Sequence, residues 1–167
     1  MSRSGVNRAG IVPLIVQSWR APARVFAGLC GMPDRALIMV LMVAMLIFLI
    51  AQAPGHARAA ELDPSVPLSA RMAGALFAVM FVMPLVFYLL ASVVSVLSRL
   101  FPRRISAENS RLALFWALLA VSPAMLLAGM VAGLVGPGAA LILCQALAGL
   151  GFLYIWGAGL RVLSEKT

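Results

Sequence analysis

The run MAGALFAVMFVMPLVFYLLASVVSVL, at residues 72–97, contains no acidic, basic or histidine side chain. An α-helix rises about 1.5 Å per residue, so a helix of this length crosses the ~30 Å hydrocarbon core of a bilayer. Backbone polar groups inside lipid must be bonded within their own segment, and a helix achieves this. The run therefore predicts a membrane-spanning helix.

Three further runs share this property, at residues 36–53, 112–135 and 139–160. The whole chain is 63% hydrophobic and only 11% charged. A soluble domain has about 25% charged residues, well above this value. Disordered chains contain few apolar residues, so the high hydrophobic fraction excludes disorder. We therefore expect an all-α integral membrane protein with four transmembrane helices.

The basic residues are distributed unevenly between the connections. Arg58 and Arg71 lie between the first two runs, and all the others of the 13 Lys and Arg residues lie in the N-terminal arm, near the second connection or in the tail. The positive-inside rule then predicts a multi-pass protein of the cell inner membrane with both termini in the cytoplasm. This distribution also explains the net charge of +8 without a nucleic-acid partner.

The chain divides into four parts on this interpretation. We expect a flexible basic N-terminus at residues 1–10, an interfacial amphipathic segment at 11–31, a four-span membrane domain at 32–163 and a cytoplasmic tail at 164–167. Pro54 and Gly55 are expected to end the first span, Ser106 to cap the third, and residues 136–138 to form a tight turn before the fourth. A secretory signal cleaved near Ala57 is a poorer interpretation of the first span, because the preceding arm is long.

The segment at residues 11–31 has apolar side chains at spacings of three and four, with arginines on another side. This pattern predicts a helix in the headgroup region of the bilayer. A helix packed into the protein core has the same pattern, and that alternative stays open. The residues expected at the membrane interface are Trp19, Arg20, Pro22, Arg24 and Phe26.

Small residues and prolines occur inside the predicted spans. Gly129 and Gly133 form a GxxxG motif, and Ala91 and Ser95 form a similar small-residue pair; both motifs allow two helices to approach closely. We expect them to pack the chain's own helices, with contact to a partner as the alternative. Pro84 and Pro123 should kink the second and third helices.

No pattern of reactive residues accompanies these spans. Transporters and pumps place ionisable groups inside the bilayer, and none lies within the four runs. His56, Glu61 and Asp63 lie near one another in sequence, but we expect a solvated loop there rather than a metal site. We therefore predict no catalytic residue, no cofactor and no bound metal.

Two stretches resemble the Yip domain family in its short bacterial form: SWRAPARVF at residues 18–26, and RLALFW at 111–116 continuing to Ser122 and Pro123. Membership implies a multi-span helical domain without known catalytic residues, associated in eukaryotes with vesicle traffic and small GTPases. The sequence has neither the long cytoplasmic N-terminal domain nor the Asp-Leu-Tyr-Gly-Pro motif of the eukaryotic proteins, and it has four runs where the family often has five spans. Only the fold and the membrane location are therefore carried over.

The leading hypothesis is a non-enzymatic, Yip-type inner-membrane protein that acts through helix packing and contacts with lipid or protein. The partners expected are the lipid bilayer and other membrane proteins or a second copy of the chain. The alternative is an accessory or assembly subunit of a larger membrane complex. A small transporter or lipid-transfer protein is a weaker third hypothesis, because the spans lack charged groups.

Overall fold

A computed structural model describes residues 10–166 of the chain, and the predicted flexible N-terminus lies almost entirely outside the described residues. Four helical segments are long and apolar enough to cross a membrane. They are α3 (Asp34–Leu62), α4 (Leu68–Phe77) continued by the π-helical turn η2 (Ala78–Val82) and α5 (Met83–Ser98), α6 (Ala107–Leu134) and α7 (Ala139–Leu163). The prediction of an all-α protein with four transmembrane helices is confirmed at the level of length and composition.

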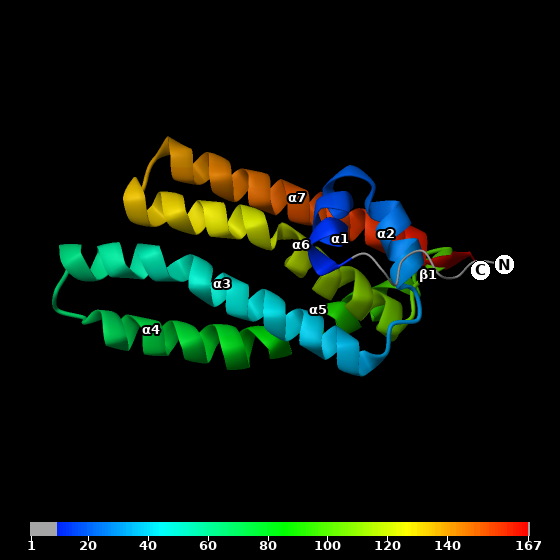
Figure 1. The fold of residues 1–167 in the computed structure, drawn as a ribbon. Helices are drawn as coiled ribbons and strands as arrows, with labels where there is room; N and C mark the ends of the chain where they lie inside the picture. Colours follow the sequence, from blue (N-terminus) through cyan, green and yellow to red (C-terminus); the bar gives the residue numbers. More distant parts are fainter. Residues whose placement is uncertain (1–9, 167) are drawn as a thin grey trace.

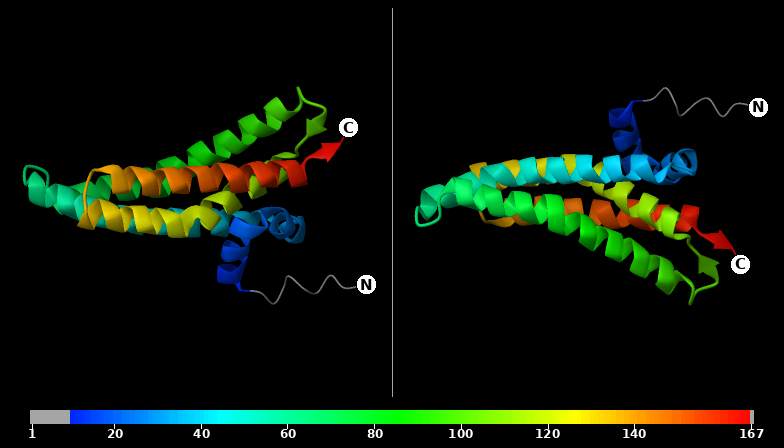
Figure 2. Two further views of the ribbon diagram at one scale, coloured as in Figure 1. Left: turned by 90° about the horizontal axis from the view of Figure 1, so that it is seen from above. Right: turned by 90° about the horizontal axis from the view of Figure 1, so that it is seen from below.

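Two short helices precede the spans: α1 (Ile11–Arg20) and α2 (Pro22–Leu29). They lie at the end of the bundle where α3 and α6 begin and where α5 and α7 end (Figure 1). Figure 2 shows α1 crossing the long helices rather than running beside them. At the same end, β1 (Arg103–Arg104) pairs in antiparallel fashion with β2 (Glu165–Lys166) in the tail. We call this the arginine end.

The first span is longer than predicted. Pro54 lies inside α3, and the helix continues for two further turns to Leu62. A proline removes one ladder hydrogen bond, but a close contact with another helix can offset that loss. Such a contact exists, because Pro54 packs against Gly133 of α6. His56 and Arg58 therefore lie in a helix and not in a loop. The predicted end of the first span at Pro54 and Gly55 is wrong, and the helix ends at Leu62.

The second span changes its winding before Pro84. The turn η2 has π-helical hydrogen bonding, and Pro84 lies in the first turn of α5 directly after it. The ring of a proline clashes with the carbonyl four residues earlier, which here belongs to Met80 inside η2. The wider π turn accommodates this carbonyl. Pro123 lies within α6, which runs on without interruption to Leu134.

The boundaries of the last two spans follow their local signals. The Ser106 hydroxyl accepts a hydrogen bond from the Asn109 N–H (3.2 Å), as expected of an N-cap. Gly136 has φ of 91° in the turn between α6 and α7, a conformation that other residues adopt only with strain. The two helices therefore form the antiparallel hairpin that the sequence predicts.

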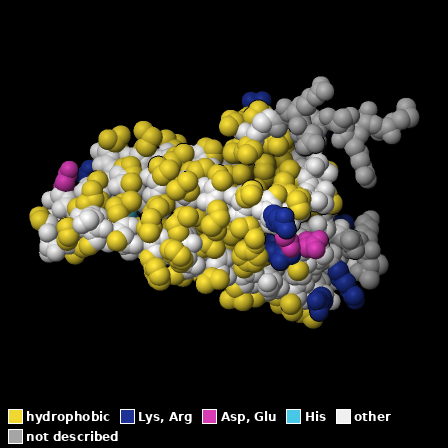
Figure 3. All heavy atoms as spheres, turned by 60° about the horizontal axis from the view of Figure 1, so that its bottom comes forward, with side chains coloured by type: hydrophobic (Ala, Val, Ile, Leu, Met, Phe, Trp, Pro, Cys, Tyr) yellow, Lys and Arg dark blue, Asp and Glu magenta, His cyan; other side chains and the backbone are white. Residues whose placement is uncertain are grey.

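The core of the bundle is α6. In the most apolar stretch of α6, 56% of the residues are buried inside the protein. The corresponding share is 17% in the second and fourth spans. It packs against α3 and α7 along their lengths and against α5 over a shorter contact. The outer faces of α5 and α7 remain exposed, and Figure 3 shows hydrophobic side chains covering the middle of the molecule with charged side chains towards its ends.

Candidate functional site

The segment at residues 11–31 packs into the bundle through its aromatic side chains. The Trp19 ring covers Gly151 of α7, where an added Cβ would lie 2.3 Å from the ring, and the Phe26 ring covers Gly159 in the same way at 2.7 Å. Trp19 Nε1 donates to the Ala120 carbonyl oxygen (2.8 Å). Glycines on α7 thus form two recesses that accept aromatic rings from α1 and α2.

A buried polar contact fixes α1 further. The Trp116 indole N–H donates to the Ser18 hydroxyl (2.9 Å), which in turn donates to the Leu14 carbonyl oxygen (2.8 Å). Ser18 is completely buried. Because a buried donor without a partner is costly, this pair stabilises one position of α1 against α6.

Three of the five residues predicted at the membrane interface are covered by other parts of the chain. Phe26 is fully buried, Pro22 is buried, and Trp19 is only partly exposed with its polar atom bonded to α6. Arg20 and Arg24 are exposed. The open alternative, a helix packed into the protein core, therefore describes the apolar face of this segment, while its arginines face outward.

Both small-residue motifs lie in contacts within the chain. A Cβ on Gly129 would lie 1.8 Å from the Ala51 carbonyl oxygen, and one on Gly133 would lie 2.4 Å from the Pro54 Cβ. On α5, the Ala91 carbonyl accepts from the Ser110 hydroxyl (2.7 Å) of α6. Ser95, one turn later, donates to the Ile105 carbonyl oxygen (3.1 Å). These motifs pack the chain's own helices.

Arg58 closes the end of the bundle away from the termini. Its Nη1 donates to the carbonyl oxygens of Gly133 (3.2 Å) and Leu134 (3.4 Å), which are free at the C-terminus of α6. A cation there also interacts favourably with the helix dipole. Arg58 thus joins the last turns of α3 to the end of α6.

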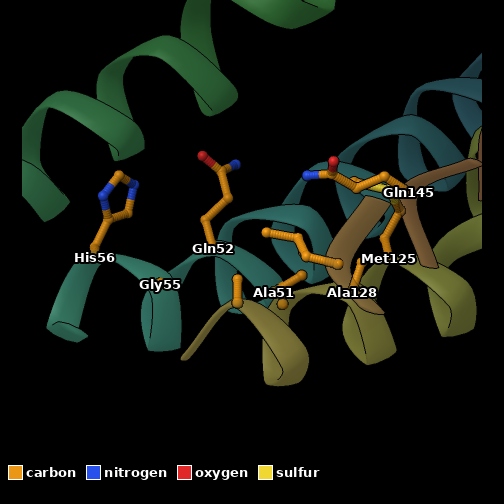
Figure 4. A pocket seen from close by; sticks show the side chains of 10 residues that line it. Ala51, Gln52, Gly55, His56, Met125, Ala128 and Gln145 are labelled. Atoms are coloured by element: carbon orange, nitrogen blue, oxygen red, sulfur yellow. The ribbon is translucent and has the colours of Figure 1, made fainter. Parts of the chain in front are cut away.

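The most distinctive polar feature is a pocket between α3, α6 and α7, with a volume of about 230 Å³. Gln52 and His56 contribute to it from α3, one turn apart, and Gln145 from α7 (Figure 4). Apolar and small residues form the rest of its walls: Ala51, Gly55, Met125, Ala128, Gly129, Ala132 and Leu141. We call it the polar pocket.

Hydrogen-bonding capacity in the polar pocket is incompletely used. His56 Nε2 is buried and has no hydrogen-bond partner among the described residues. Gln52 Nε2 donates to the Phe48 carbonyl oxygen (3.3 Å), which leaves its amide oxygen free to accept. Gln145 is exposed and makes no hydrogen bond within the described part of the chain. The pocket therefore offers hydrogen-bond donors and acceptors inside a largely apolar wall.

Sequence reasoning did not find this arrangement. It placed His56 in a solvated loop and did not single out Gln52. The available signal was the i, i+4 spacing of Gln52 and His56, which places both on one face of a helix that continues past Pro54. No group of three His, Cys, Asp or Glu side chains in residues 10–166 is arranged to hold a metal ion.

The fold and this surface define a multi-pass, all-α membrane protein. Comparison of the chain with protein-family models, with curated proteins and with solved structures finds no match. The resemblance to the Yip domain family therefore stays a hypothesis.

Proposed function

We propose that this chain is a non-enzymatic inner-membrane protein, of the Yip type, that acts through lateral contacts with a membrane component at the polar pocket. The observation that carries the proposal is the convergence of Gln52, His56 and Gln145 on one apolar pocket with hydrogen-bonding atoms left free. A free amide in lipid is costly, because no water replaces the missing partner. A bound component that supplies donors or acceptors removes this cost.

The proposed orientation supports the same function. With the arginine end in the cytoplasm, the polar pocket lies towards the outer leaflet, beside the last turns of α3. A component bound there would be reached from within the membrane, since Gln52 and Gln145 are exposed on the sides of their helices. Glutamine side chains of this kind bond to polar groups of neighbouring helices or of lipids.

The test is purification of the full chain from its native membrane in a mild detergent, followed by identification of lipid and protein that remain bound in fixed ratio. We expect such a component with the unmodified protein and its loss from a Gln52→Leu/Gln145→Leu variant. Gln17→Leu is the matched control, because Gln17 is an exposed glutamine of α1 outside the polar pocket. Retention by the double variant, or no bound component at all, would contradict the proposal.

The second candidate is an accessory or assembly subunit of a larger complex. It is favoured by the exposed apolar side chains along α7, which include Leu143, Leu147 and Leu150. The same purification separates the two candidates. A protein partner in fixed ratio favours the subunit, whereas a monomer or a homo-oligomer that carries lipid favours the first proposal.

A further inference from the structure

We propose that the groove between α5 and α7 at the arginine end binds one anionic phospholipid, with its phosphate between Arg103 and Arg161 and an acyl chain along the apolar walls. The groove has a volume of about 190 Å³. The inference rests on the membrane location proposed above and names one lipid class for a site separate from the polar pocket.

The walls of the groove suit an acyl chain. Val94 and Ser98 line it on α5, Leu160 on α7, and Phe101 and Ile105 in the connection that follows α5. Helix α5 packs against α6 but makes no extensive contact with α7, so the two helices separate towards this end, as Figure 2 shows. In a bilayer the space between two such helices is filled by lipid, because water is excluded there.

The charges at the mouth suit a phosphate. Arg103 and Arg161 line the groove itself, and Arg99 and Arg104 line an adjoining pocket of about 400 Å³ that shares Ile105 with it. None of these four arginines forms an ion pair with a carboxylate whose side chain the structure describes. In the strand pairing, Arg104 lies opposite Glu165 and Arg103 lies opposite Lys166. Guanidinium groups bind phosphate in bidentate fashion, and basic pockets between spanning helices bind anionic headgroups.

Hydrogen bonds fix the connection between α5 and α6, which forms one side of the groove. The Ser98 hydroxyl accepts from the Ile105 N–H (3.1 Å), and the Ser95 hydroxyl donates to the Ile105 carbonyl oxygen (3.1 Å). The pairing of β1 with β2 links the same connection to the tail after α7, and Asn109 Nδ2 donates to the Leu163 carbonyl oxygen (3.1 Å). The arginines are therefore carried by backbone that is fixed before any ligand binds, which reduces the entropy lost on binding.

Lipid binding by the purified full chain in neutral detergent, followed by native mass spectrometry with added phosphatidylglycerol or phosphatidylcholine, tests the inference. We expect one phosphatidylglycerol to bind more tightly than phosphatidylcholine. Arg103→Gln/Arg161→Gln should weaken phosphatidylglycerol binding by roughly thirtyfold, since each arginine near a membrane surface contributes about 1 kcal/mol. Arg103→Lys/Arg161→Lys keeps the charge and should retain most of the binding. Arg20→Gln/Arg24→Gln is the matched control, because both arginines are exposed at the same end but lie outside this groove.

Two further arms distinguish the source of the phosphate and the role of the groove. Inorganic phosphate at millimolar concentration should not displace the lipid, because it lacks an acyl chain. Val94→Phe, which fills the groove without removing a charge, should weaken lipid binding although the variant elutes from size exclusion as the unmodified protein does. Equal loss in the Arg20/Arg24 control, equal binding of both lipids, or displacement by inorganic phosphate would overturn the inference. Such a result would not bear on the function proposed for the polar pocket, because the purification of the Gln52→Leu/Gln145→Leu variant tests that site separately.

Discussion

The indole Nε1 of Trp19 donates a hydrogen bond of 2.8 Å to the carbonyl oxygen of Ala120, 101 residues further along the chain. This bond ties α1 to the middle of the third span, one turn before Pro123. Pro123 has no N–H to donate to the Leu119 carbonyl, so the helix ladder is weakened one residue before the carbonyl that Trp19 bonds. The short N-terminal helices are thus part of the bundle core.

Trp19→Phe should destabilise the protein by about 1 kcal/mol or more, because the hydrogen bond to Ala120 is lost and the shorter ring lacks the distal indole atoms that cover Gly151. Unfolding of the purified protein by a denaturing detergent, followed by circular dichroism, measures the change. Val12→Ala, at an exposed position of the same helix, is the control. Equal stability of the two variants would mean that the bond contributes nothing.

Gly129→Ala should destabilise the protein by about 2 kcal/mol or more, because the new Cβ would overlap the Ala51 carbonyl oxygen and force α3 and α6 apart. Gly149→Ala is the matched control. A Cβ at Gly149 meets nothing within 4 Å, so that variant should be neutral or more stable by up to about 1 kcal/mol. The thermal unfolding midpoint should therefore fall for Gly129→Ala and stay unchanged or rise for Gly149→Ala. A tolerated alanine at position 129 would contradict the close helix contact.

Arg58→Gln should loosen the end of α6, because the carbonyls of Gly133 and Leu134 lose their charged donor. We expect a loss of about 1 kcal/mol and faster hydrogen exchange in the last turn of α6 and in the turn that follows. Arg35→Gln removes an exposed arginine near the start of α3 and should leave that exchange unchanged. Unchanged exchange in both variants would show that Arg58 does not cap α6.

The loop between α3 and α4 should respond to pH through Asp63. Hydrogen bonds from the Ser65 hydroxyl and backbone N–H hold the pKa of Asp63 below its ordinary value of 3.8, and Arg71 adds to the effect. A lowered carboxyl pKa stabilises the fold above the unfolded pKa, and the contribution is lost as pH falls through the lowered folded value. Ser65→Ala should raise the Asp63 pKa measured by NMR titration, whereas Ser69→Ala in the next helix should not. A lower or unchanged pKa in Ser65→Ala would contradict this arrangement.

The sequence predicts the number of spans well because charge and hydropathy decide it. It leaves the surroundings of residues 11–31 open, because the face that includes Trp19 and Phe26 has the same spacing whether lipid or protein covers it. Only the glycines that receive these rings, Gly151 and Gly159, distinguish the two cases, and they lie in another span.

The polar pocket could not be predicted from the sequence for a related reason. Pro54 and Gly55 indicate a helix end when each is considered alone. Their packing against α6 depends on Gly133, which is distant in sequence. The extension of α3 that places His56 in the wall of the same pocket as Gln145 therefore follows from tertiary contact.

A topology map by reporter fusion tests the central claim most directly. Alkaline phosphatase, which is active only when exported, and a fluorescent protein that folds only in the cytoplasm are fused in parallel after Ser65, Pro102, Pro137 and Thr167. We predict phosphatase activity at Ser65 and Pro137 and fluorescence at Pro102 and Thr167. An exported reporter after Thr167, or the same compartment for Ser65 and Pro102, would contradict four spans with both termini in the cytoplasm.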